Sequence, residues 1–244
     1  MPRKKEVRIL ESYEDFVDRT GYQKAELQLG EGDFTPDKRV LEKVSPDNRL
    51  CPFYGDTVVF DLDDRTKEKI AALIGQLYAS APECFSERLR ANTIHMTLHD
   101  LSASANLEEV APETFRNEVA LMKLLHDNPL QPQTIKMRSH FIINMVNTSL
   151  VLALRPADKE EWNKLQALYD LINRVKVCPY PFLTPHITLA YFNRNGFDEA
   201  AAQRLCQAVY PMNQKHFGIT LRTSRLYYQK FTGMNDYINV ARLT

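Results

Sequence analysis

From position 57 onwards the chain alternates between short apolar runs and longer stretches with helical spacing. The run at 57–62 is rich in β-branched and apolar residues and predicts a strand. The next stretch predicts a helix, because an aspartate can cap it and one face carries Ile70, Leu73, Ile74 and Leu77. The same reasoning predicts strands at 93–98, 135–144, 149–154, 186–192, 217–229 and 237–243, and helices at about 112–126, 158–175 and 198–209.

The first part of the chain has a different character. Residues 1–53 contain only short segments with helical spacing, such as 13–19, and are interrupted by Gly21, Gly30, Gly32, Pro36, Pro46 and Pro52. We therefore interpret 1–53 as an irregular N-terminal extension and 54–244 as a single domain.

The order strand, helix, strand occurs twice within that domain. The segments 58–95 and 151–186 are nearly equal in length, begin in an apolar strand, pass through a helix and end on the same four-residue pattern. This duplication predicts an α+β, bilobal fold whose two lobes face each other across a cleft.

The repeated pattern is His, apolar, Thr, Leu. It is found as His95-Met96-Thr97-Leu98 and as His186-Ile187-Thr188-Leu189. Residues two apart in a strand share a face, so in each copy the imidazole and the hydroxyl lie side by side while the apolar residues face the core. Each lobe is therefore expected to present a histidine and a threonine on an open sheet face.

Two such strands opposed across a cleft offer the groups that phosphodiester cleavage requires. The reaction needs a base for the attacking oxygen, an acid for the leaving oxygen and donors for the phosphoryl oxygens. Imidazole suits both proton-transfer roles because its unperturbed pKa of about 6.5 lies near neutral pH. The sequence therefore indicates acid–base chemistry at phosphorus.

The doubled HxT motif resembles that of the two-histidine (2H) phosphoesterase superfamily, which includes RNA 2′,3′-cyclic phosphodiesterases known as 2′-5′ RNA ligases. The segment 182–191 is similar to the second motif of that family, and the resemblance covers about 55–243. It implies two antiparallel sheets facing a central cleft, with helices on the outside. It also implies chemistry without metal or cofactor, with His95 and His186 as acid and base and Thr97 and Thr188 as phosphate ligands.

The function expected from these observations is a phosphoric diester hydrolase that acts on a cyclic or 2′-5′ phosphodiester of a nucleotide or short RNA, as in RNA processing. One alternative is a non-catalytic module that binds a phosphate or an RNA end in the same cleft. Another is a metal-dependent hydrolase that uses His95 and His99, which are spaced as HxxxH. We interpret His99 as a cleft-edge or structural residue on the same strand face as His95.

Aromatic and basic residues outside the motifs are weaker candidates. Tyr54, Tyr191 and Tyr228 are candidates for stacking on a nucleobase, although Tyr191 is expected on the strand face opposite Thr188. The basic residues in or beside predicted strands that could add positive charge to the cleft are Arg138, Arg155, Arg225 and Lys230.

Charge and composition exclude some classes of protein. The chain has 31 Lys and Arg against 31 Asp and Glu, which argues against a protein that coats DNA or RNA. Its apolar runs are far shorter than the roughly 18 residues that span a bilayer. Acidic residues follow the basic start, and the four cysteines form no CxxC pair, so we expect reduced thiols in a cytoplasmic protein with no membrane partner. The sequence does not indicate an oligomeric state.

Overall fold

The computed structural model describes residues 11–178 and 182–244. Its strands are β1 (Pro52–Asp61), β2 (His95–Ser104), β3 (Thr134–Met145), β4 (Ser149–Pro156), β5 (His186–Tyr191), β6 (Gly218–Arg222), β7 (Leu226–Gly233) and β8 (Asp236–Arg242). Its α-helices are α1 (Tyr13–Arg19), α2 (Asp64–Ser80), α3 (Leu107–Asp127), α4 (Lys159–Ile172) and α5 (Glu199–Met212). Short 3₁₀ turns occupy Lys38–Glu42, Pro82–Cys84, Ala91–Thr93 and Thr223–Arg225.

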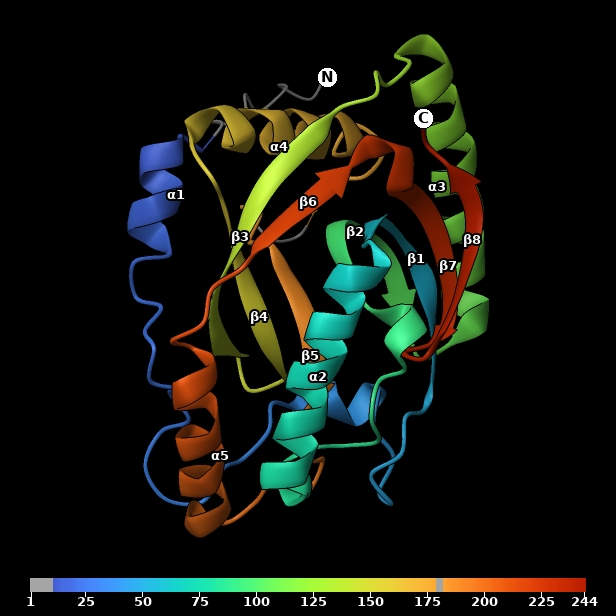
Figure 1. Ribbon diagram of the computed structural model, residues 1–244. Coiled ribbons are helices and arrows are strands. Elements are labelled where there is room, and N and C mark those ends of the chain that lie inside the picture. Colours follow the sequence, from blue (N-terminus) through green and yellow to red (C-terminus); the bar gives the residue numbers. More distant parts are fainter. Residues whose placement is uncertain (1–10, 179–181) are drawn as a thin grey trace, which may run out of the picture.

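The strands form two antiparallel sheets, ordered β2-β1-β7-β8 and β5-β4-β3-β6, which lie side by side (Figure 1). The strands β2 and β5, which begin with the two motif histidines, each lie at an edge of their sheet and contact each other. The predicted α+β architecture of two antiparallel sheets is therefore confirmed, and its duplication brings the two motifs to one seam.

The region predicted as one strand at 217–229 is instead two strands that belong to different sheets. β6 pairs with β3, whereas β7 pairs with β1. The chain turns between them because the Thr223 hydroxyl accepts a hydrogen bond from the Gln133 amide at 2.9 Å, and the Thr223 amide donates to the Gln133 carbonyl at 3.0 Å. The two lobes are thus interleaved in sequence.

The helices begin where polar side chains cap them. The residues that accept a hydrogen bond from a first-turn amide are Ser12, Asp63, Asn106, Asp158 and Asp198. Helix α3 contacts β1 and β2, α4 contacts β3 and β4, and α2 packs against α5. One continuous core lies between the helices and the two sheets, with Trp162 and Phe60 fully buried within it.

The N-terminal extension is packed against both lobes. Phe16 of α1 stacks on Trp162 of α4 with ring centroids 4.3 Å apart. Further along, Val40 and Val44 are buried in a second apolar cluster with Tyr191 of β5 and Phe231 of β7. Between residues 11 and 51 the extension contains α1 and one 3₁₀ turn but no strand, and β1 begins at Pro52.

Phe16→Ala should strongly destabilise the protein, because this ring is 1% exposed and its loss leaves a cavity over Trp162. We expect the free energy of unfolding to fall by about 3 to 5 kcal/mol in urea denaturation. Tyr22→Ala is the control, since Tyr22 is 63% exposed and should change stability by less than about 0.5 kcal/mol. Similar small effects for both variants would contradict the packing of α1 against α4.

Candidate active site

The two motif histidines are held in the same way. Nδ1 of His95 lies 2.7 Å from the carbonyl oxygen of Thr93, and Nδ1 of His186 lies 2.8 Å from that of Thr184. A carbonyl oxygen can only accept, so Nδ1 of each neutral ring carries the proton and Nε2 carries the lone pair. Both rings therefore have Nε2 available for proton transfer.

The hydroxyls of the motifs lie beside these rings. Thr97 and Thr188 are partly exposed, as are the two histidines, whereas the apolar residues between them are buried. Each copy therefore presents His and Thr on one face of an edge strand, as the alternation predicts. The charge of His186 is close enough to lower the pKa of His95.

A bulge follows the motif in both copies. The strand register shifts by one residue at Leu98 in β2 and at Leu189 in β5. An extra residue of this kind reverses the alternation of faces beyond it. Side chains on the far side of each bulge therefore point opposite to the positions that simple alternation assigns.

His99 lies on the core face as a result, and the expectation that it shares a face with His95 is wrong. It is 1% exposed, its Nε2 lies 2.8 Å from Oδ1 of Asn173, and its ring packs 5.1 Å from that of Tyr169. The interpretation of His99 as a structural residue is thus supported, and the HxxxH pair does not converge. Among the described residues, no group of three or more His, Cys, Asp or Glu is arranged to hold a metal ion.

The same effect places Tyr191 on the motif face, so the expectation that it lies opposite Thr188 is also wrong. Tyr191 pairs with Ser149 and Thr188 pairs with Val151, and these two partners are two apart on β4. Tyr191 is nevertheless 9% exposed, because Lys43 lies 5.2 Å from its ring. Residues of the extension therefore cover much of this ring.

Two other tyrosines do not face the motifs. Tyr228 is fully buried and its hydroxyl donates to Asp56 at 3.0 Å and to the Thr114 carbonyl at 3.1 Å. The expectation that Tyr228 contacts substrate is therefore wrong. The prediction failed because period-two alternation does not distinguish the face of a sheet that helices cover from the open face. Tyr54 shares the face of Asp56, which bonds to Asn117 of α3, and so also points away from His95.

A polar cavity of about 530 Å³ lies beside His95. Tyr237 of β8 lines it and meets the His95 ring edge to face, with centroids 4.9 Å apart. On the same surface the Gln229 amide donates to Oδ1 of Asn239 at 2.7 Å. The cavity thus combines an imidazole, an aromatic ring and amide groups.

Charged side chains of both signs line this cavity. Asp61 pairs across the sheet with His95, and its carboxylate bonds both Lys67 of α2 and Arg225, each at 2.5 Å. Lys67 and Asp61 line the cavity together with Arg90 and Asp236, which form a second ion pair, so the charged side chains of the lining balance in sign. Of the other basic candidates, Lys230 pairs with Glu118 and Arg155 donates to the Thr20 carbonyl, while Arg138 is exposed and lies opposite Arg155 on the neighbouring strand.

The surroundings of His95 lower its pKa to about 4. Burial is the main cause, and the Thr93 hydrogen bond and Asp100 oppose it, while Lys67 and His186 lower the pKa further. His95 is therefore neutral at neutral pH and can accept a proton at Nε2.

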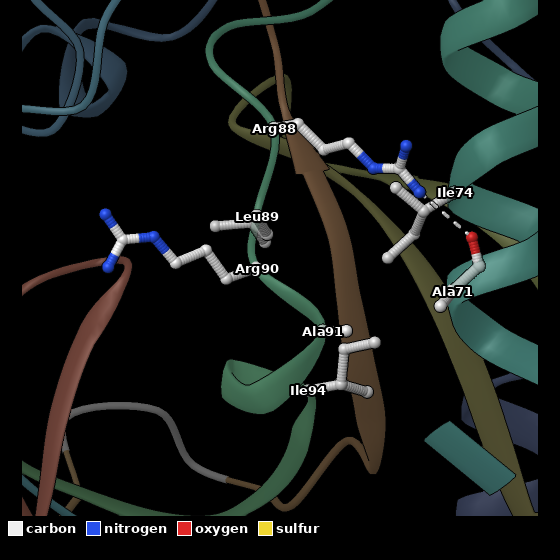
Figure 2. A pocket seen from close by; sticks show the side chains of 7 residues that line it. All are labelled: Ala71, Ile74, Arg88, Leu89, Arg90, Ala91 and Ile94. Atoms are coloured by element: carbon white, nitrogen blue, oxygen red, sulfur yellow. Dashed lines mark hydrogen bonds between the residues drawn. The ribbon is translucent and has the colours of Figure 1, made fainter. Parts of the chain in front are cut away.

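A second, more apolar cavity of about 360 Å³ lies between α2 and the segment that precedes β2 (Figure 2). Figure 2 shows Arg88 directed toward Ala71, whose carbonyl accepts a hydrogen bond at 3.2 Å, and Arg90 directed away from it. Arg90 lines both cavities, but neither motif histidine lines the second, more apolar cavity. Of the four motif residues, His95 lines the polar cavity, whereas Thr97, His186 and Thr188 line neither of the two cavities.

Sequence reasoning missed part of the repeat. Thr93 and Thr184 extend the pattern to Thr-x-His-x-Thr-Leu, a signal that the sequence contains. Lys67 and Tyr237 carry no such signal, because they come from a helix and a strand remote from the motif.

Comparisons with known proteins define the fold. No protein-family model and no curated protein matches the chain. A conserved protein of unknown function from Agrobacterium tumefaciens superposes with a TM-score of 0.65 at 15% identity, over 86% of this chain and 94% of that one. E. coli LigT matches with a TM-score of 0.43 in complexes with NADP+ (16% identity) and with 3′-AMP (17% identity), over 78% of this chain and 96% and 97% of LigT. The fold is thus shared with the first protein, whereas the lower scores do not by themselves establish a common fold.

Among the described helices, none combines the length and the apolar character that a bilayer-spanning helix requires.

The lowered pKa of His95 predicts a loss of stability in acid. The unfolded imidazole titrates near 6.5 and the folded one near 4, so between these pH values the unfolded chain binds more protons and stability falls as the pH decreases. In His95→Gln this contribution is absent. Urea denaturation across this pH window should therefore show a smaller decline in the free energy of unfolding than in wild type. His140, whose pKa is also lowered to about 4, is present in both proteins and cancels in the comparison. An equal decline in both proteins would contradict the lowered pKa of His95.

Proposed function

We propose that this chain is a metal-independent phosphoesterase of the two-histidine type. It cleaves a cyclic (2′,3′ or related) or 2′-5′ phosphodiester of a nucleotide or short RNA. The observation that carries the proposal is the matched anchoring of His95 and His186 through Nδ1, on edge strands that meet. This arrangement leaves two imidazole nitrogens for the two proton transfers that diester hydrolysis needs.

In the proposed reaction His95 acts as the base, because its lowered pKa keeps it neutral. Nε2 of His95 takes a proton from water while the water oxygen forms a bond to phosphorus. The bond from phosphorus to the leaving ribose oxygen then breaks, and His186 supplies the proton to that oxygen. The products are a phosphate monoester and a free hydroxyl, and a proton passes from His95 back to His186 before the next turnover.

The remaining groups bind the charge and the nucleotide. Thr97 and Thr188 donate hydrogen bonds to the non-bridging phosphoryl oxygens, and Lys67 and Arg90 are the basic side chains that line the cavity. A cavity of about 530 Å³ falls in the usual range for small-molecule sites, which supports a nucleotide or the end of a short RNA as ligand.

We also propose that the protein acts in the cytosol. All four cysteines are free thiols, Cys84 is buried, and burial raises the pKa of its thiol to about 12. Such unreactive thiols fit a reducing compartment.

His95→Ala and His186→Ala should each lower kcat by about two to four orders of magnitude, because each removes one proton-transfer group. The assay is hydrolysis of a 2′,3′-cyclic nucleotide and a 2′-5′ dinucleotide with a chelator present. His126→Ala is the control, since this histidine is exposed on α3.

Loss of only a few-fold in both variants, with circular dichroism unchanged, would overturn the acid–base assignment. If wild-type protein in excess binds the nucleotides but releases no product, the same cleft acts as a non-catalytic binding module.

Tyr237→Ala should lower kcat/KM by about 3- to 10-fold, because the edge-to-face contact that orients the His95 ring is lost. Tyr237→Phe keeps this ring contact and should remain near wild type. Burial raises the pKa of the Tyr237 phenol, so the hydroxyl takes no part as an anion. A large loss in the phenylalanine variant would show that the hydroxyl, rather than the ring, is required.

A further inference from the structure

The two histidines are anchored alike, but the segments that anchor them are held differently. In the first copy a 3₁₀ turn fixes the Thr93 carbonyl. The Thr93 amide and hydroxyl both donate to the Arg90 carbonyl, at 3.0 and 2.8 Å, and the Ile94 amide donates to the Ala91 carbonyl at 3.3 Å. The acceptor for His95 is therefore positioned by its own neighbours.

The second copy cannot form the same turn. The position equivalent to Ile94 is Pro185, which has no N–H to close it. Pro185 is instead tied to β4, where its carbonyl accepts a hydrogen bond from Leu154 at 2.9 Å. The residues just before it need another partner.

That partner is Arg19, from the last turn of α1 in the N-terminal extension. Its Nη1 donates to the Thr184 hydroxyl at 2.9 Å and its Nη2 donates to the Leu183 carbonyl at 2.9 Å. One guanidinium thus bridges the two residues that lead to His186, 165 positions away from Thr184 in sequence.

Arg19 is itself fixed from behind. Its Nε and Nη2 donate to the two oxygens of Glu11, at 2.5 and 2.9 Å, and the Glu11 side chain is 4% exposed. The Glu11 carbonyl accepts a hydrogen bond from the Trp162 indole at 3.1 Å, which ties the pair to α4. All three nitrogens of the guanidinium are in use, a geometry that lysine cannot reproduce.

We propose that Arg19 is a positioning residue for His186. It holds Thr184 so that the carbonyl of this residue keeps the His186 proton on Nδ1 and directs Nε2 into the site. The extension thereby fixes the carbonyl acceptor for the histidine of the second copy, as the 3₁₀ turn fixes it in the first copy. The consequence for turnover rests on the proposed function, whereas the effect on the His186 ring does not.

The test compares the two histidine rings in one protein by ¹H–¹⁵N NMR of their side chains. In wild type both neutral rings should carry the proton on Nδ1, with assignments taken from His95→Ala and His186→Ala. In Arg19→Ala the His186 ring should become a mixture of tautomers, while His95 stays unchanged as an internal control. Arg49→Ala removes an exposed pair with Asp47 elsewhere in the extension and should alter neither ring.

Kinetics give a second readout. Arg19→Ala and Arg19→Lys should lower kcat by about 10- to 100-fold with little change in KM, since misplacement of a proton-transfer group acts on the chemical step. Thr184→Val should have the same effect, Thr184→Ser should restore activity, and the double variant with Arg19→Ala should be no worse than the more severe single variant.

An unchanged His186 ring in a folded Arg19→Ala protein would overturn the proposal, and so would equal changes in both rings. If Arg19→Ala does not fold, Thr184→Val gives the same readout, because it leaves the pair with Glu11 intact. Absence of turnover in wild type would contradict the proposed function and leave the NMR result valid.

Discussion

The site depends on one hydrogen bond that the fold makes twice, from Nδ1 of a motif histidine to the carbonyl oxygen two residues earlier. This bond selects the tautomer and aims Nε2 away from the backbone. It can form only if the segment before each edge strand has a fixed conformation, so whatever holds Thr93 and Thr184 also controls the chemistry. The bulges after the motifs serve the same arrangement, because they return the next residues to the core while the histidine and threonine stay on the open face.

The two copies have the same motif but different surroundings, and the roles proposed for the two histidines rest on this difference. His95 is flanked by Tyr237 and by Lys67, which pairs with Asp61, and its pKa falls to about 4. His186 follows a proline and is supported by a residue from outside the duplicated unit. In the proposed reaction these differences assign the base to His95 and the acid to His186.

Hydrophobic periodicity was sufficient to predict the α+β architecture and the two strands that carry the motifs. It also predicted that His95 and Thr97 lie on the same strand face. It failed where the backbone departs from regular alternation. His99 and Tyr191 lie beyond bulges, which no side-chain pattern marks in a single sequence. The 217–229 segment looks continuous because β6 and β7 are both apolar, yet contacts between Thr223 and the remote Gln133 turn the chain into the other sheet. Long-range contacts of this kind also explain why Lys67 and Tyr237 were not predicted.

The N-terminal extension also covers part of the motif face of β5. On the open face of β5, His186 and Thr188 are partly exposed, but Tyr191 is covered by Lys43 and joined to Val40 and Val44 in a closed apolar cluster. The same cluster includes Phe231 of β7 and Met234 of the turn between β7 and β8, so it joins residues of the extension and of both lobes. The polar cavity beside His95 adjoins this cluster, because Tyr237 lines the cavity and also packs against the cluster. The extension therefore borders the cavity through this cluster and contacts the segment before His186 through Arg19.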